Sequence, residues 1–271
     1  MSEDSTSAPD AREQRNAVRD HYGEFAAGEG DACGVSGSSC CGGDEVDVSE
    51  TARELGYSTE ELEAVAEGAN LGVGCGNPTA IANLDEGETV VDLGSGAGFD
   101  CFLAGQEVGP SGQVVGVDMT PEMVERARDN VEKNDADAVE FRLGEIEHLP
   151  VADATADVVI SNCVVNLSPD KPQVFDEVYR VLAPGGRVAI TDVVLTADLP
   201  DGLRTDLDAI SNCIAGASRI ADLEAMLEDA GFESVSVEPK DDSDAFIREW
   251  TEDRDLSDYV ASARITARKP A

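Results

Sequence analysis

The sequence of 271 residues predicts an α/β fold with a doubly wound, mostly parallel sheet and additions at both ends of the chain. From residue 88 onward, short runs of Val, Ile and Leu alternate with segments of helical periodicity, the pattern of strands joined by helical crossovers. The first run leads directly into a glycine-rich turn, as expected where a helix starts beside the end of a parallel strand. Apolar residues make up 41% of the chain but aromatic residues only 4%, so Val, Ile, Leu and Ala must fill the core.

The N-terminal part is expected to form helices around a cysteine-bearing loop. A first helix is indicated within residues 1–30 by three apolar residues at helical spacing, namely Val18, Tyr22 and Phe25. The Gly, Ser and Asp content of residues 28–50 predicts a mobile loop. Ser58 and Glu61 have the spacing of a capping box, which predicts a short helix that continues through residues 65–69.

The strand and helix pattern then organises the rest of the chain. Strands are expected at residues 89–93, 113–118, 139–143, 157–162 and 187–194. Helices are expected at residues 99–108, at 121–133 with Thr120 as cap and proline first, and at 172–182 before a Pro-Gly-Gly stop. A linker at 196–201, a helix at 221–230 and strands at 232–238 and 263–269 complete the pattern. We therefore divide the chain into an N-terminal segment (1–70), a core (71–195) and a C-terminal segment (196–271).

The charge balance excludes some classes of protein. With 57 acidic and 19 basic side chains the formal net charge is −38, so a nucleic-acid binder built on a basic surface is excluded. The carboxylates are spread over the whole chain, and we interpret them as adaptation to a salt-rich cytoplasm, where counter-ions screen self-repulsion. No apolar run is long enough for a membrane span, and the polar, acidic N-terminus is unlike a signal peptide. We therefore expect a cytoplasmic protein with no membrane or nucleic-acid partner.

The cysteines are the unusual chemical feature of the sequence. There are seven, and without secretory features they are expected to be reactive or metal-binding thiols rather than a disulfide framework. Paired CxxC motifs are absent and only two histidines occur, so any such site must use sulfur. Cys163 follows the fourth strand, at the sheet edge where ligands bind, and Cys75 lies between two glycines that cannot pack it. We assign Cys101 to the core, and the pattern leaves Cys213 ambiguous.

The glycine-rich turn carries the second chemical signal. Asp92 precedes Gly94-Ser95-Gly96-Ala97-Gly98, and the Gly-x-Gly-x-Gly spacing resembles the first motif of S-adenosylmethionine-dependent methyltransferases. Asp118 ends the second strand, from where its carboxylate can accept hydrogen bonds from both ribose hydroxyls. The resemblance implies that Asp92 helps to fix the methionine end, with Gly94, Ser95 and Gly96 in the loop. It also implies that three further residues lie near the adenine: Met119, Glu145 and Ile146.

Several motifs together resemble those of arsenite methyltransferases over roughly residues 15–240. They are Gly74-Cys-Gly-Asn-Pro78, Asp92-Leu-Gly-Ser-Gly-Ala-Gly98, Gly116-Val-Asp-Met-Thr120, Gly144-Glu-Ile-Glu147 and Ser161-Asn-Cys-Val-Val-Asn-Leu-Ser-Pro-Asp-Lys171. The resemblance implies methylation of arsenite by S-adenosylmethionine, with Cys75, Cys163 and Cys213 as the arsenic-binding thiols. Three sulfurs suit As(III) because it is a soft ion.

The resemblance also implies partners and a further cysteine. A fourth, N-terminal cysteine is expected to pair with Cys75, and Cys33, Cys40 and Cys41 all compete for that place. The glycines and serines around Cys40 and Cys41 favour one of these two, which would form a disulfide with Cys75 that an external thiol reopens. The expected partners are arsenite, methylated arsenicals and a thiol reductant such as thioredoxin or a glutathione-like thiol, and we expect a monomer.

Two other functions remain open on the sequence. A C-methyltransferase of a quinone-like small molecule would share the glycine loop and Asp118, but it would not need thiols at positions 75, 163 and 213. A non-catalytic thiol protein that binds metalloid would need the thiols but no cofactor loop. Arsenic methylation uses both sets of residues.

Overall fold

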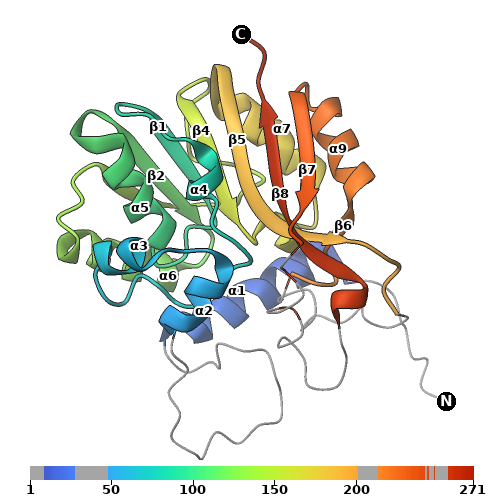
Figure 1. Cartoon of the computed structure of the whole chain (residues 1–271), viewed down its shortest axis with the longest axis horizontal. Coiled ribbons are helices and arrows are strands. Elements are labelled where there is room, and N and C mark those ends of the chain that lie inside the picture. The colour runs from blue at the N-terminus through green and yellow to red at the C-terminus, as the bar shows by residue number, and fades with distance from the viewer. Residues whose placement is uncertain (1–8, 28–47, 201–212, 242, 244–246, 248–255) are drawn as a thin grey trace, which may run out of the picture.

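The computed structural model describes residues 9–27, 48–200, 213–241, 243, 247 and 256–271. Their sheet has the strand order β3-β2-β1-β4-β5-β8-β7, with the short β6 also paired to β5 (Figure 1). The parallel strands are β1 (Thr89–Leu93), β2 (Gln113–Asp118), β3 (Val139–Leu143), β4 (Ala156–Asn162), β5 (Leu182–Leu195) and β6 (Ser218–Arg219). Two C-terminal strands complete the sheet, β7 (Glu233–Pro239) and β8 (Val260–Arg268), and β8 runs antiparallel to both β5 and β7. The predicted α/β class with a mostly parallel sheet is confirmed.

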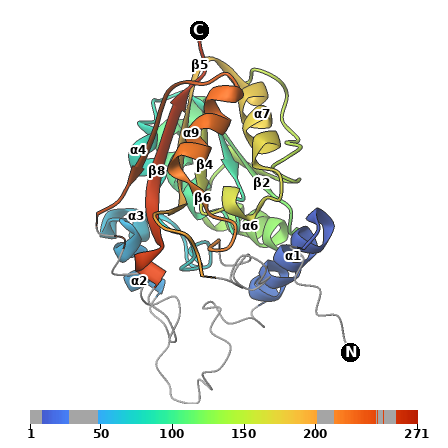
Figure 2. The ribbon, with the colours of Figure 1, turned by 90° about the vertical axis from the view of Figure 1, so that its right-hand side faces the viewer.

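Helices cover both faces of this sheet. Neighbouring residues of a strand point to opposite faces, so each strand contributes side chains to two cores. Val90 of β1 belongs to the core under α5 (Phe99–Val108) and α6 (Pro121–Lys133). Val91, the next residue, belongs to the core under α7 (Lys171–Val181) and α9 (Ile220–Asp229). Figure 2 shows the sheet nearly edge-on, with α7 and α9 on one side and α4 on the other. The core is aliphatic, as the low aromatic content requires.

The N-terminal helices lie at the carboxyl ends of the parallel strands (Figure 1). They are α1 (Ala11–Ala27), α2 (Val48–Leu55) and α3 (Thr59–Ala64), whereas the short α4 (Thr79–Ala82) packs against the face of the sheet (Figure 1 and Figure 2). Three single-turn 3-10 helices complete the described elements: η1 (Gly109–Ser111), η2 (Val165–Leu167) and η5 (Leu256–Asp258). Val18 of α1 is buried in the core, so α1 closes this end of the sheet. Within the described residues, no helix is long and apolar enough to cross a membrane.

Two boundary predictions in the N-terminal half are corrected by the structure, and the predicted cap at Thr120 is confirmed by position. The expected loop at 28–50 does not reach residue 50, because α2 begins at Val48; residues 28–47 lie outside the described part. The capping box of Ser58 and Glu61 is present, but α3 ends at Ala64 since the backbone of Val65 is extended. Thr120 stands at the N-cap of α6 as predicted, yet its hydroxyl makes no capping hydrogen bond.

The start of β5 is the third correction. The strand begins at Leu182, five residues before the predicted start, and includes the Pro-Gly-Gly segment that was expected only to end the preceding helix. The pairing with β4 is irregular at this point, since Ala156 pairs with Leu182 and the next matched pair is Val158 with Arg187. A glycine-rich bulge therefore extends the strand, which periodicity alone does not reveal.

Candidate functional site

The strand order reverses between β1 and β4, and the candidate site lies at this point. β2 and β3 continue the sheet on one side of β1, while β4 and β5 continue it on the other. Open α/β sheets bind their ligands outside the carboxyl ends of the strands at such a switch. Two adjoining cavities of about 800 and 530 Å³ open here and share Gly94, Gly96 and Asn162 in their walls.

The glycine loop after β1 forms the floor between the two cavities. Gly94 has a φ of +68°, and a Cβ built on it would lie 2.5 Å from the side chain of Val164, so only glycine fits there. Gly96 has a φ of +51°, but a Cβ there would meet no atom within 4 Å, so its backbone faces open space. The loop therefore presents bare backbone to a ligand.

Asp118 at the end of β2 holds this loop and lines the larger cavity. Its Oδ2 accepts a hydrogen bond from Gly96 N–H at 2.9 Å, and its Oδ1 accepts one from Thr120 N–H at 2.8 Å. Burial raises the pKa of Asp118, and these backbone donors counteract the shift. Each carboxylate oxygen has lone pairs left for a further donor, so both can serve ribose hydroxyls.

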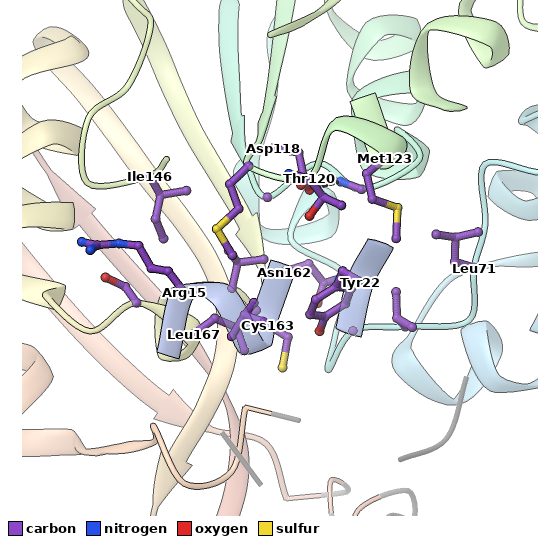
Figure 3. A pocket seen from close by; sticks show the side chains of 18 of the residues that line it. Arg15, Tyr22, Leu71, Asp118, Thr120, Met123, Ile146, Asn162, Cys163 and Leu167 are labelled. Atoms are coloured by element: carbon purple, nitrogen blue, oxygen red, sulfur yellow. Dashed lines mark hydrogen bonds between the residues drawn. The ribbon is translucent and has the colours of Figure 1, made fainter. Parts of the chain in front are cut away.

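The walls of the larger cavity include most of the residues expected near an adenine. Figure 3 shows Asp118, Thr120 and Ile146 around one part of the cavity, with Cys163, Leu167 and Tyr22 in another. Met119 and Ile146 line it as expected, but Glu145 does not. Instead Glu145 contacts two arginines of α1, with Arg15 Nε at 3.6 Å and Arg19 Nη2 at 3.5 Å. The acidic residue of this loop that lines the cavity is Glu147, two positions further on.

The smaller cavity contains two buried carboxylates without a cationic partner in the described residues. Asp92, at 2% exposure, accepts a hydrogen bond from the thiol of Cys101 at 3.2 Å. Asp100, on the first turn of α5, accepts hydrogen bonds from Tyr57 Oη at 2.6 Å and Asn162 Nδ2 at 3.3 Å. Burial raises the pKa of Asp92, and it raises that of Asp100 to about 6. A cation bound here would stabilise both ionised carboxyls.

S-adenosylmethionine fits this pair of cavities. The buried hydroxyl of Ser95 has no hydrogen-bond partner in the described part of the chain and lines the smaller cavity. A buried polar group without a partner costs free energy unless a ligand satisfies it. The methionine carboxylate would accept this hydrogen bond, the methionine ammonium would lie beside Asp92 and Asp100, and the ribose would lie beside Asp118.

The proposed arsenic ligands Cys163 and Cys213 come together at the end of β4. Cys163 follows the last residue of β4, is 9% exposed and lines the larger cavity. Cys213 comes from a segment 50 residues further along, and its thiol donates a hydrogen bond to the carbonyl oxygen of Cys163 at 2.7 Å. Both residues have left-handed backbone, with φ of +60° and +63°. Such strain in residues other than glycine is typical of functional sites.

Cys75 is the third member of the thiol cluster. Its N–H donates to Asn162 Oδ1 at 3.0 Å, and its carbonyl accepts from Ser262 Oγ at 2.6 Å. The flanking Gly74 and Gly76 allow this approach: a Cβ on Gly74 would lie 2.8 Å from Asn162, and one on Gly76 would lie 2.9 Å from Thr191. The expectation that glycines leave Cys75 unpacked is wrong, because the residue is completely buried.

Burial and contact between thiols favour the protonated forms of Cys75 and Cys163. Burial raises the pKa of Cys75. The pKa of Cys163 is also raised, most of all by contact with the thiols of Cys213 and Cys75, between which it lies, and further by burial. The carboxylate of Asp192 is a fourth member of the cluster: within the described residues, one of its oxygens and the sulfurs of Cys75 and Cys163 lie within 4.8 Å of one another.

The segment that carries Cys213 is clamped to the core by residues of the Asn-Leu-Ser-Pro-Asp-Lys motif. The ammonium group of Lys171 donates a hydrogen bond to the carbonyl of Gly216. A Cβ on Gly216 would lie 2.0 Å from the carbonyl oxygen of Asn166, so the two backbones pack directly against each other. Asn166 Nδ2 in turn donates to Asp192 Oδ1 at 2.8 Å. Lys171 and Asn166 thus determine where Cys213 lies.

The remaining cysteines behave differently. Cys101 is completely buried and belongs to the core, as predicted. Cys33, Cys40 and Cys41 lie outside the described residues. Sequence reasoning missed Tyr57, Asp100 and Asp192 as parts of the site. For Asp100 and Asp192 the sequence offered only their positions as a signal. Asp100 lies in the first turn after the glycine loop, and Asp192 lies near the end of β5, where parallel strands bring side chains together.

Comparisons with known proteins agree with this geometry. Residues 84–231 match the family model described as a methyltransferase domain. The chain is 59% identical to an arsenite methyltransferase of Halobacterium salinarum over 97% of its own length and 68% of that protein. It is 36% identical to an arsenite methyltransferase of Aquipseudomonas alcaligenes, covering 80% of this chain and 61% of that one.

A solved structure supports the same comparison. The crystal structure of an arsenic(III) S-adenosylmethionine methyltransferase from Chlamydomonas reinhardtii superposes with a TM-score of 0.59 at 34% identity. The match covers 84% of this chain and 75% of the algal one.

Proposed function

Because the chain belongs to the arsenite methyltransferase family, we propose that it transfers methyl groups from S-adenosylmethionine to arsenite bound by cysteine thiols, and so serves arsenic detoxification. The observation that carries this proposal is the position of Cys163. Its thiol lines the same cavity as Asp118 and Gly96 of the cofactor site, and it touches the other two thiols of the cluster. Acceptor and methyl donor would therefore meet in one cavity.

The cofactor would be held by the three acids and the glycine loop. Asp118 accepts hydrogen bonds from the ribose, Asp92 and Asp100 attract the ammonium group, and the Ser95 hydroxyl donates to the carboxylate. When bound, S-adenosylmethionine supplies an electrophilic methyl group on a positively charged sulfur. Met119 and Ile146 enclose the adenine. Gly94 has no side chain, so the cofactor can approach the backbone of the loop closely.

Arsenite binding would proceed by condensation with neutral thiols. Three thiols and As(OH)₃ form three As–S bonds and release three water molecules, so that no net charge is buried in the step. The raised pKa values of Cys75 and Cys163 suit this chemistry, because each thiol proton leaves with a hydroxyl of arsenite. Cys213 would provide the third sulfur. The product is a neutral trigonal arsenic with one lone pair.

Methyl transfer would then require alignment rather than acid or base catalysis. The arsenic lone pair forms the As–C bond while the bond from the methyl carbon to the cofactor sulfur breaks, and its electron pair stays on that sulfur. Arsenic carries no proton to remove, so the protein contributes position and orientation. Cys163, the thiol that lines the cavity, would direct the lone pair towards the methyl group.

Turnover would need a reductant, since each transfer formally oxidises arsenic by two electrons. We assign this role to the thiols of Cys75 and of Cys40 or Cys41: the second thiol attacks the sulfur of Cys75 and loses its proton, the As–S bond breaks with its electron pair left on arsenic, and the two cysteines form a disulfide. An external dithiol or a glutathione-like thiol then reduces this disulfide by exchange. We further propose that the enzyme works as a monomer in the cytoplasm on arsenite and methylated arsenicals.

Incubation of the purified chain with methyl-labelled S-adenosylmethionine tests the proposal against its two alternatives. With arsenite as acceptor, label should appear in arsenic species, and Cys163→Ser and Cys213→Ser should each abolish it because a hydroxyl is a hard, protonated ligand. Cys101→Ser is the matched control and should remain active. Label in a quinone precursor instead, or arsenic binding without transfer, would contradict the proposal.

A further inference from the structure

Asp192 is a buried carboxylate whose place beside the thiols is not explained by arsenic chemistry. It is 1% exposed and lies within the buried part of β5. Within the described residues, no lysine, arginine or histidine nitrogen lies within 4.0 Å of its oxygens. Buried carboxylates in proteins are ordinarily paired with a cation or coordinate a metal. Arsenic(III) is soft and does not compete well for a hard carboxylate when thiols are present.

The atoms around Asp192 form a compact donor set. One of its carboxylate oxygens lies within 4.8 Å of the sulfurs of Cys75 and Cys163, which are themselves within 4.8 Å of each other. Around a tetrahedral zinc ion with Zn–S bonds of about 2.3 Å, sulfur ligands lie about 3.8 Å apart. The three donors thus need to approach by about 1 Å or less, which small side-chain rotations can supply.

The carboxylate is also oriented as a metal ligand requires. Its Oδ1 accepts hydrogen bonds from Asn166 Nδ2 at 2.8 Å and from Val193 N–H at 2.7 Å. Its Oδ2 accepts one from Asn166 N–H at 3.2 Å. Donors of this kind fix the orientation of metal-bound carboxylates in a second layer of contacts.

From this arrangement we infer that Cys75, Cys163 and Asp192 form a binding site for a zinc-like divalent cation, which competes with arsenite for the first two residues. Two thiolates and one carboxylate around a divalent ion carry a net charge of −1. Burial raises the pKa of Asp192, and the ammonium group of Lys171 lies close enough to counteract part of this shift, so a compensating positive charge is nearby. On binding, the two thiols release their protons to solvent.

The two ligands should depend on different residues. Arsenite needs a third sulfur and no carboxylate, so its site would extend to Cys213. The cation needs the carboxylate, and the sulfur of Cys213 does not belong to the group of donor atoms within 4.8 Å. Only the competition, and not cation binding itself, rests on the proposed arsenite methyltransferase function.

Cobalt(II) is the probe for the test, because its thiolate charge-transfer absorption reports directly on Co–S bonds. The parent protein should carry Cys33→Ser, Cys40→Ser and Cys41→Ser, which removes the thiols outside the described residues. One cobalt per chain should bind, with an absorption intensity that corresponds to two Co–S bonds, and arsenite should displace it. Three Co–S bonds, or no binding, would overturn the inference without the need for any further variant.

Two substitutions in this parent separate the cation from arsenite. Asp192→Asn, which preserves shape, should weaken cobalt binding at least tenfold and change arsenite affinity less than threefold. Cys213→Ser should weaken arsenite binding at least tenfold and change cobalt affinity less than threefold. Calorimetric titration with S-adenosylmethionine checks that both variants retain their fold. The site is refuted if Asp192→Asn binds cobalt as tightly as the parent, or if Cys213→Ser loses as much cobalt affinity as Asp192→Asn is expected to lose. Failure of arsenite alone to bind would count only against the proposed function.

Discussion

The thiol of Cys213 donates a hydrogen bond to the backbone carbonyl of Cys163 at 2.7 Å, and both residues adopt left-handed backbone. The two cysteines are 50 positions apart, so this contact depends on the tertiary structure alone. Left-handed backbone in a residue other than glycine costs on the order of 1 kcal/mol or more, which the surrounding contacts must supply. The thiol cluster is therefore held in place before any ligand binds.

Removal of the Asp118 carboxylate should weaken cofactor binding. Asp118→Ala deletes the proposed ribose acceptor and also the acceptor that holds Gly96 and Thr120. We expect a loss of about 1.5–3 kcal/mol in the binding of S-adenosylmethionine, measured by calorimetry, while arsenite affinity is retained. Glu140→Ala, in an exposed acid of β3, is the control. Unchanged cofactor affinity in Asp118→Ala would remove Asp118 from the site.

The pH dependence of cofactor binding should report on Asp100. Burial raises its pKa to about 6, so the carboxyl becomes neutral as the pH falls through 6 and no longer attracts the ammonium group. Affinity for S-adenosylmethionine should therefore decrease below pH 6, by at most about tenfold per pH unit, and binding at pH 6 should release protons.

The variant Asp100→Asn isolates this effect. It should bind more weakly than the parent at pH 7.5 and show a flatter pH profile, since the titrating group is gone. Calorimetry between pH 5 and 7.5, in buffers of different ionisation enthalpy, measures both quantities. A parent affinity independent of pH over this range would contradict the assignment.

Lys171 should act as a positioning residue for Cys213. Lys171→Met removes the hydrogen bond to Gly216 and releases the segment that follows Cys213. Alkylation of Cys213 should become faster by at least threefold, while Cys75 reacts as slowly as before, and the KM for arsenite should rise with the KM for S-adenosylmethionine unchanged. Lys171→Arg should partly restore both values. Equal Cys213 reactivity in all three proteins would show that Lys171 has no such role.

The redox proposal concerns Cys75 and the cysteines before α2. After turnover without reductant, peptide mapping by mass spectrometry should find Cys75 linked to Cys40 or Cys41. Since Cys75 is completely buried, the link should not form when arsenite is absent and the protein is only exposed to air. A link to Cys33, or no link after turnover, would contradict this version of the cycle.

The sequence predicted the sheet better than the site, for physical reasons. Strands such as residues 113–118 carry their own periodic signal, and the Gly-x-Gly-x-Gly turn after Asp92 is a local motif that can be recognised in the sequence. Contacts across long sequence distances carry no such signal. The unpacked position inferred for Cys75 was wrong because Asn162 and Ser262 cover it from distant strands.

Other parts of the site followed from position alone. Cys163 was expected at the ligand-binding edge because it directly follows a parallel strand. Asp192 occupies a comparable place on β5, but a single acid near a strand end does not distinguish a ligand from a structural residue. Glu145 shows the converse, since its motif suggested the cavity and its side chain contacts Arg15 and Arg19 instead.

The central claim is that three sulfur atoms of one chain hold the arsenic, and arsenic X-ray absorption tests it most directly. The protein is the parent in which Cys33, Cys40 and Cys41 are serine, loaded with one equivalent of arsenite without added thiol. We predict three As–S bonds and no As–O bond, falling to two As–S bonds in Cys213→Ser and in Cys163→Ser but not in Cys101→Ser. Two sulfurs and one oxygen around arsenic in the parent, or three sulfurs that survive Cys213→Ser, would contradict the account.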